Sequence, residues 1–239
     1  MEVQTYVGAL RDEGSAMADC ARDHLGLPIP CCPGWDMAEL VEHVGEMHHA
    51  ICELILSRAM DPDQIEDPVP PTTGLVDWFE AGVEDLARVL LEADPAQPVW
   101  TWSEQNTVSF WQRRMAIETA VHRWDAESAV GNPGPVEASL AADGIDEFFT
   151  LHMLRDGADL RGDGELLHFH SSDSPGDWTL RLGAGARELI TDHRSNATSV
   201  RATASDLLLL LWRRLPAAAV DVSGDDRLLR RFLERMDLT

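Results

Sequence analysis

The sequence predicts an α+β protein with a four-helix bundle at the N-terminus and a small C-terminal domain of antiparallel sheet with helices on one face. From residue 3 to residue 130, apolar residues recur every three or four positions, which is the period of a helix. After about residue 156 the pattern shortens to strand-length segments between Gly-, Pro- and Asn-containing turns. A chain of 239 residues is long enough for two cores. We therefore expect two domains, residues 1–156 and 157–239.

The bundle helices are delimited by ordinary start and stop signals. The first ends before Gly26 and Pro28, and Asp36 with Glu39 three residues later resembles a capping box at the start of the second. Asp94 and Pro95 end the third helix, and the Gly-Asn-Pro run at residues 131–133 ends the fourth. The four helices are expected over residues 3–25, 36–54, 75–90 and 108–130.

A further helix over residues 135–155 leads to a Gly- and Asp-rich stretch, residues 156–164, where we place the domain boundary. Four strands follow, and then two helices that complete the domain. A small antiparallel sheet with helices on one face is the simplest architecture for this order of strands and helices. The strands are expected over residues 165–170, 178–182, 188–191 and 199–202, and the helices over residues 205–212 and 225–236.

The charge balance restricts the partners. Nineteen basic residues, all of them Arg, against 42 acidic ones give a formal net charge of -23, which repels nucleic acid and anionic lipid surfaces. No apolar run approaches the ~20 residues that span a bilayer, so we expect no membrane partner. The N-terminus does not resemble a signal peptide, and a cytoplasmic location is expected. Arg without Lys, with abundant Ala and Asp, is typical of a GC-rich genome.

The four cysteines are expected to be reduced thiols. They are Cys20, Cys31, Cys32 and Cys52, they form no C-x-x-C pair, and nothing in the sequence indicates secretion. A redox role for the adjacent pair Cys31–Cys32 is the weaker alternative.

Three residues form a candidate metal site. Glu118 and His122 are four residues apart on one helix and therefore share a face, the same face that carries Trp111 and Met115. His43 lies on the apolar face of the second helix. Buried ionisable groups need a partner or a metal, so two inward-facing helices present three ligands for a divalent ion, zinc by preference. The alternative for the Glu-His pair is a surface ion pair.

Other polar residues carry weaker indications. His48 and His49 are expected to be solvated, and His168 and His170 share a face of a strand, where a metal is a minor alternative. Asp125, three residues after His122, either orients the imidazole of His122 or has an exposed capping or ion-pair role.

Two motifs carry a resemblance that covers nearly the whole chain. The stretch CPGWD followed by ELVEH at residues 32–43, together with RM and ETAVHRWDAE at residues 114–127, resembles the mycothiol-dependent maleylpyruvate isomerase family of actinobacteria. That family belongs to the DinB-like helical bundles, and its second domain is similar to sterol-carrier proteins; here ASDL to LWRR at residues 204–214 matches that domain's signature.

The resemblance implies specific roles. The family's metal ligands fall on His43, Glu118 and His122, the residues that helical spacing also selects. Its second-domain arginine, which holds the anionic substrate or the thiol, falls on Arg214. Two departures are visible: many members have His immediately before the ligand Glu, where this chain has Ile117, and Gly is common where this chain has Arg213.

These observations predict an enzyme that uses a metal and a thiol. Three protein ligands leave a coordination position open, as in catalytic zinc sites, and a thiol bound there becomes a thiolate. The resemblance implies mycothiol as that thiol, and cis-trans isomerisation of a small anionic or electrophilic substrate by thiolate addition, rotation and elimination. Because the net charge of -23 repels an anion, Arg214 is expected to supply a local cation.

Three alternatives stay open. The same thiolate could be transferred to an electrophile in detoxification or natural-product biosynthesis, which makes the protein a mycothiol S-transferase. A metal-activated hydroxide would make it a hydrolase. A metal that only braces the bundle would leave a non-catalytic protein that binds a metal and a small molecule.

Overall fold

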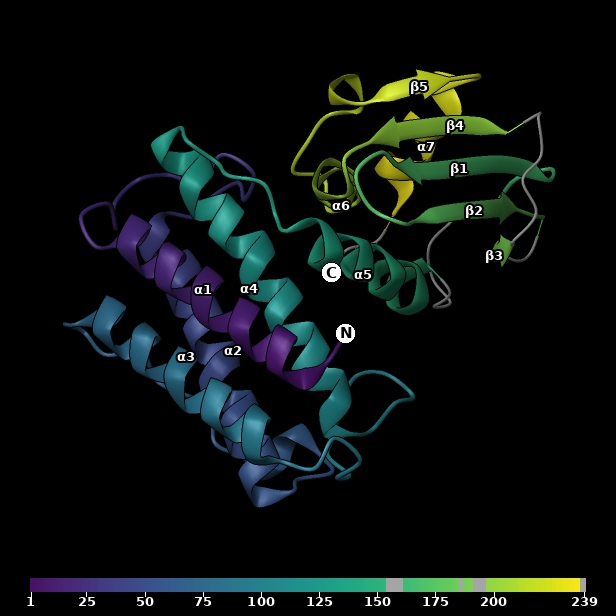
Figure 1. Ribbon diagram of the computed structural model, residues 1–239. Coiled ribbons are helices and arrows are strands. Elements are labelled where there is room, and N and C mark those ends of the chain that lie inside the picture. The colour runs from purple at the N-terminus through teal and green to yellow at the C-terminus, as the bar shows by residue number, and fades with distance from the viewer. Residues whose placement is uncertain (154–160, 185–186, 191–196, 237–239) are drawn as a thin grey trace. The chain divides into compact units, whose positions relative to one another are not determined.

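Helices account for the first part of the chain, and a sheet with helices for the rest, as expected for an α+β fold (Figure 1). The computed structural model describes residues 1–153, 161–184, 187–190 and 197–236. Contacts divide the chain into two compact units, Met1–Gly134 and Pro135–Thr239. The sequence analysis placed the division near residue 156 instead. The difference is the helix after Gly134, which packs on a helix of the second unit and so belongs to that core.

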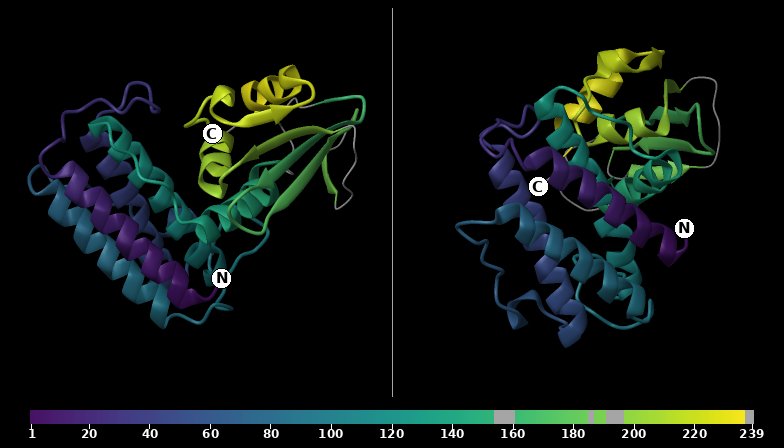
Figure 2. Two further views of the ribbon diagram at one scale, coloured as in Figure 1. Left: turned by 45° about the horizontal axis from the view of Figure 1, so that its top comes forward. Right: turned by 60° about the vertical axis from the view of Figure 1, so that its left-hand side comes forward.

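Four helices form the first unit and run side by side in both views of Figure 2. Helix α1 packs against α3 and α4, and α2 packs against the same two helices, so each helix has two close neighbours. Their apolar faces meet in a core that includes Leu10, Leu40, Phe79 and Trp111, all fully buried. The four helices are α1 (Val3–Ala21), α2 (Met37–Ser57), α3 (Leu75–Glu92) and α4 (Val108–Val130).

The ends of the two helices that carry the candidate ligands are set by local signals. Asp36 caps α2: its side chain accepts from the backbone N–H of Glu39 at 3.0 Å, and the Glu39 side chain accepts from the N–H of Asp36 at 2.8 Å. The predicted capping box is therefore confirmed. Gly131 ends α4 with a φ of 81°, a left-handed conformation that glycine adopts without steric cost.

The second unit begins with α5 (Ala138–Phe148), which continues as a π-helical turn, Phe149–Met153. Its five-stranded sheet has the order β3-β2-β1-β4-β5. The expected antiparallel sheet is correct for three of the pairings and wrong for one, because β1 and β4 pair in parallel. The strands are β1 (Glu165–Ser171), β2 (Asp177–Leu182), β3 (Arg187–Ile190), β4 (Thr198–Ala202) and β5 (Asp221–Ser223).

One face of this sheet holds the core of the second unit. Phe169 on β1 is fully buried, with Phe149 after α5 at 5.5 Å between ring centroids and Phe232 on the last helix at 5.8 Å. The remaining elements are α6 (Ala204–Leu211), a 3-10 turn (Ala217–Ala219) and α7 (Asp226–Arg235). Helices from both ends of the unit thus cover the face that carries Phe169, as predicted.

The sequence analysis missed the short strand β5, and the expected ends of two elements, residues 155 and 191, lie outside the described residues. Within the part of the chain that the structure describes, none of the helices combines the length and the apolar character that a bilayer crossing requires.

Candidate metal centre

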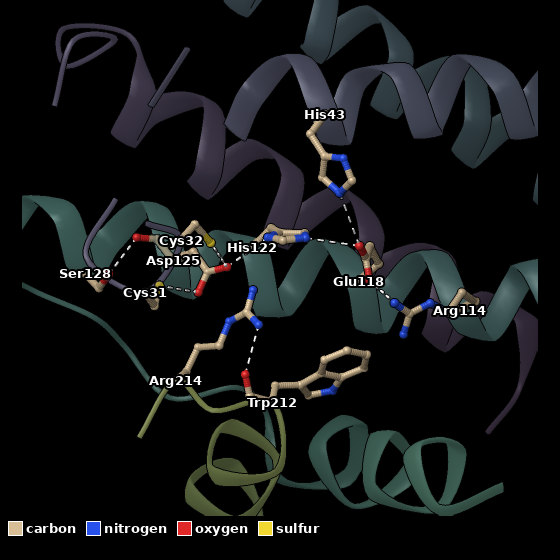
Figure 3. A network of polar contacts seen from close by, with 10 residues as sticks. All are labelled: Cys31, Cys32, His43, Arg114, Glu118, His122, Asp125, Ser128, Trp212 and Arg214. Atoms are coloured by element: carbon tan, nitrogen blue, oxygen red, sulfur yellow. Dashed lines mark hydrogen bonds and ion pairs between the residues drawn. The ribbon is translucent and has the colours of Figure 1, made fainter. Parts of the chain in front are cut away.

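Two histidine side chains, one from α2 and one from α4, converge on one carboxylate oxygen of Glu118 (Figure 3). Nε2 of His122 lies 3.1 Å from Oε1 of Glu118, and Nε2 of His43 lies 3.7 Å from the same oxygen. The three potential ligand atoms all lie within 4.8 Å of one another. The structure therefore brings together the three residues that the sequence selected, although His43 comes from a different helix than the other two.

The helices explain this convergence. Glu118 and His122 are stacked one turn apart on α4, and α2 packs beside that helix, so that His43 faces them. The side chains of Glu118 and His122 are 14% and 9% exposed, whereas that of His43 is 37% exposed. The cluster is therefore buried on the α4 side and open to solvent beside His43.

Arg114 sets the charge of the cluster. It lies one turn before Glu118 on α4, and its guanidinium pairs with Oε2 of Glu118, which leaves Oε1 to the two histidines. Burial alone would raise the pKa of Glu118, but the charges of Arg114 and His122 outweigh burial and hold this pKa well below its ordinary value. Glu118 is therefore a carboxylate at neutral pH.

His122 carries a proton when no metal is bound. Burial on its own would lower the pKa of His122, but the carboxylates of Glu118 and Asp125 raise it from 6.5 to about 9. The proton is held between two carboxylates, where a cation is favoured. The negative charge of these carboxylates would also stabilise a divalent ion in place of the proton.

Asp125 orients His122. It lies three residues further along α4, is fully buried, and its Oδ2 is 2.9 Å from Nδ1 of His122. A carboxylate on the far nitrogen of a histidine fixes the ring and its tautomer, so that Nε2 is the nitrogen presented to the cluster. Of the two roles considered for Asp125, the structure confirms the orienting one.

The donor set fits zinc. A tetrahedral zinc ion holds imidazole and carboxylate ligands at about 2.0–2.2 Å, which separates neighbouring ligand atoms by about 3.4 Å. The two distances to Oε1 of Glu118, 3.1 and 3.7 Å, bracket this separation. Within the described residues, no fourth His, Cys, Asp or Glu joins the cluster. Two neutral imidazoles and one carboxylate with an open position are typical of catalytic zinc sites.

Sequence reasoning missed two residues at this site. The ring of Trp35 packs edge-on against that of His43, with 5.0 Å between centroids, and so limits its rotation. Arg114 was not predicted to lie at the site, although its spacing of four residues from Glu118 on one helix indicates an ion pair between the two. Its guanidinium also lies 5.9 Å from the ring centre of Trp102.

A second group of potential ligands lies on the other side of His122. Sγ of Cys31 donates to Oδ1 of Asp125 at 3.0 Å, and Sγ of Cys32 lies 3.8 Å from Oδ2. Hydrogen bonding with Cys32, burial and the charge of Asp125 all raise the pKa of the Cys31 thiol. The sequence analysis gave the adjacent cysteines no partner.

The remaining histidines lie elsewhere. The expectation that His48 is solvated is wrong: it is fully buried, its Nε2 lies 2.9 Å from the hydroxyl of Thr119, and burial lowers its pKa to about 3. It faces inward because it lies four residues after Val44 and three before Ile51, on the buried face of α2. His168 and His170 both contact Oδ1 of Asp177, at 3.0 and 2.8 Å, and form an ion-pair group on the second unit.

Arg214 belongs to the second unit. Helix α6 ends at Leu211, and the Arg214 guanidinium donates to the carbonyl oxygen of Trp212 at 3.0 Å. Its role toward an anionic substrate stays a prediction. Arg213 has a φ of 59°, in the left-handed region, which gives a physical reason why glycine suits this position.

Comparisons with known proteins give a family match and two structures of similar fold. A sequence model of the mycothiol maleylpyruvate isomerase N-terminal domain matches residues 8–127, and one of the C-terminal domain of the same family matches residues 139–231. No curated protein sequence matches the chain. Two crystal structures are similar in fold, both of the mycothiol-dependent maleylpyruvate isomerase and both 14% identical in sequence.

The first of these structures, a histidine-to-alanine mutant, has a TM-score of 0.64 and covers 94% of this chain and 95% of its own. The second has a TM-score of 0.59 and covers 87% and 88%. At this identity the likeness shows the fold.

Proposed function

We propose that this chain, which belongs to the mycothiol maleylpyruvate isomerase family, is an enzyme that binds a divalent metal, zinc by preference, and uses a low-molecular-weight thiol as cofactor. The observation that carries the proposal is the convergence of His43, Glu118 and His122 on one point, with a side open to solvent. The family match adds mycothiol as the thiol and isomerisation of a small acid as the reaction type.

The three ligands have distinct roles in this proposal. Glu118 supplies the negative charge, and Arg114 holds its other oxygen, so that one oxygen remains for the ion. His122 presents Nε2 because Asp125 holds Nδ1. His43, the most exposed of the three, stands where the substrate and the thiol would enter.

When bound there, the ion supplies a positive charge that lowers the pKa of a thiol from about 8.5, so that the thiol reacts as a thiolate at neutral pH. The protein's own contribution is to hold the ligands in place before binding. Glu118 and His122 are already held 3.1 Å apart, so binding requires the loss of the proton of His122 but little movement of the side chains.

Isomerisation is favoured over thiol transfer by the family match alone, since the donor set serves both reactions. They differ in the fate of the thiol: an isomerase returns it in each turnover, and a transferase consumes one thiol for each product. Counting free thiol after many turnovers therefore separates the two.

The experiment that tests the proposal is cobalt substitution. The Cys31→Ser, Cys32→Ser variant is used, so that the protein's own adjacent thiols give no sulfur-to-cobalt band. It is loaded with Co²⁺, its visible spectrum is recorded, and mycothiol is added. We expect about one ion per chain at this cluster and a new sulfur-to-cobalt charge-transfer band on adding the thiol, because sulfur becomes a ligand. His43→Ala should lower the affinity for the ion by at least about tenfold, since a three-ligand site has little redundancy.

His24→Ala is the matched control, because His24 lies in the exposed turn after α1, where its Nδ1 contacts the backbone carbonyl of Cys20 at 2.8 Å. All these variants are made in the Cys31→Ser, Cys32→Ser background, and His24→Ala should equal that background in metal content and spectrum. Full metal content in folded His43→Ala, Glu118→Ala and His122→Ala variants would contradict the site. Absence of any spectral change at saturating mycothiol would contradict the role of the thiol.

A further inference from the structure

Beyond the three-ligand cluster, we propose that Cys31, Cys32 and Asp125 form a second metal site, which takes a thiophilic divalent cation. These residues offer two sulfurs and a carboxylate oxygen that lie within 4.8 Å of one another. Figure 3 shows both thiols directed at the same carboxylate, from a loop that is distant in sequence from α4.

The spacing of the donors suits an ion of this kind. A tetrahedral ion with Zn–S bonds of about 2.3 Å places its two sulfurs about 3.8 Å apart. The two sulfurs and the carboxylate oxygen here all lie within 4.8 Å of one another, so rotation of the thiols about their Cα–Cβ bonds can bring them to this separation. Both cysteines are partly exposed, which gives an ion access, whereas Asp125 is fully buried.

The loop holds the two thiols in this unusual arrangement. Adjacent residues of an extended chain direct their side chains to opposite sides. Here the backbone N–H of Cys32 donates to the carbonyl of Ile29 at 3.2 Å, and that of Trp35 donates to the carbonyl of Cys32 at 3.0 Å. Gly34 has a φ of 94°, which favours glycine. The resulting pair of turns directs both sulfurs to Asp125.

The donor chemistry selects the ion. Two thiolates and a carboxylate carry three negative charges and include two soft ligands, so they favour Zn²⁺ and softer ions such as Cd²⁺ over Mg²⁺ and Ca²⁺. Binding releases the two thiol protons to solvent. An open fourth position is filled by water.

This second site would be linked to the first through Asp125. Oδ2 of Asp125 holds Nδ1 of His122 at 2.9 Å, while Oδ1 faces the thiol of Cys31 at 3.0 Å. Oδ2 also lies 3.8 Å from Sγ of Cys32. An ion at the cysteines can bind Oδ1 of Asp125 while Oδ2 keeps its hydrogen bond to His122. His122 would then be a ligand of the first ion, and Asp125, which holds His122, would be a ligand of the second.

Cadmium titration tests this proposal, because cadmium bound to thiolate has an ultraviolet charge-transfer band that cadmium bound to imidazole and carboxylate lacks. Cd²⁺ is added to the purified wild-type protein under reducing conditions. We expect a band that saturates at one sulfur-bound ion per chain and persists in excess Mg²⁺. The Cys31→Ser, Cys32→Ser double variant should lose the band.

The chain offers a matched control in its other two cysteines, Cys20 and Cys52, which are also partly exposed. The Cys20→Ser, Cys52→Ser variant and the His43→Ala variant should both keep the band, which separates this site from the three-ligand cluster. A wild-type protein without the band, or a band unchanged in the Cys31→Ser, Cys32→Ser variant, overturns the proposal.

A measurement on the wild type alone covers the case in which the double variant does not fold. Bound Cd²⁺ should protect two of the four thiols from a thiol-specific reagent, and peptide mapping should identify them as Cys31 and Cys32. Equal reaction of all four thiols with and without Cd²⁺ refutes the site.

Discussion

At the scale of single residues, His122 connects Glu118 and Asp125, because each of its ring nitrogens faces one of these carboxylates. Its pKa of about 9 means that the metal-free protein holds a protonated imidazole between Glu118 and Asp125. The stabilisation that this proton brings to the metal-free fold is complete below about pH 6.5 and is lost as the pH rises through about 9. A metal ligand, by contrast, must be neutral.

Metal affinity should therefore rise with pH. Between about pH 7 and pH 9 the ion must displace one proton from His122, so the apparent affinity for Zn²⁺ should increase by about tenfold per pH unit and then level off. Competition against a chelator of known affinity measures this. The Cys31→Ser, Cys32→Ser variant is used so that thiols release no protons. An affinity that does not change between pH 7 and pH 9 would show that His122 is not a ligand.

Helical spacing was sufficient to predict the three candidate ligands, because Glu118 and His122 repeat at the helix period and His43 lies on an apolar face. It was not sufficient for the residues around them. Cys31 and Asp125 are 94 residues apart, and no local pattern relates a loop to a distant helix. His48 was wrongly expected to be solvated for a similar reason. Its partner, Thr119, lies on another helix, and the sequence alone does not show that the two side chains meet.

At the scale of elements, α2 depends on its capping box to hold the helix that carries His43. Asp36→Ala removes the acceptor for the N–H of Glu39, and we expect it to lower the free energy of unfolding by about 0.5–2 kcal/mol. Urea denaturation measures the change. Asp36→Asn is the matched control, because asparagine caps as well as aspartate and should cost little. Equal losses in the two variants would show that the cap is not what Asp36 contributes.

Element positions were predicted well where local signals are strong, as in α4, whose observed bounds of Val108–Val130 are those expected. Pairing was not. The alternation of a strand identifies its two faces and not its neighbour, so the parallel pair β1–β4 was missed. Strand β5 has three residues, too few to show any alternation.

At the scale of the whole molecule, the net charge of -23 opposes the binding of the anionic substrate that the proposed function requires. The long-range field repels the substrate, so local positive groups must overcome it. In the first unit, Arg114 is paired with Glu118, and Arg123 pairs with Glu13 and Glu127. The positive charge is therefore expected from the metal and from Arg214, on which the family resemblance places a substrate-holding role.

Arg214→Ala tests whether the second unit takes part in catalysis. If Arg214 holds a substrate carboxylate or the thiol, this variant should keep its metal content and fold while kcat/KM falls by about tenfold or more, the loss of roughly one charge-assisted contact. Arg214→Lys should recover only part of the activity, because an ammonium does not reproduce the bidentate guanidinium. Arg213→Ala is the control: its guanidinium donates to the backbone carbonyls of Glu234 in the last turn of α7 and of Met236 just after it, so its loss should affect stability and not turnover. Activity of Arg214→Ala equal to that of the wild type would remove Arg214 from the site, and catalysis would then be assigned to the helical bundle alone.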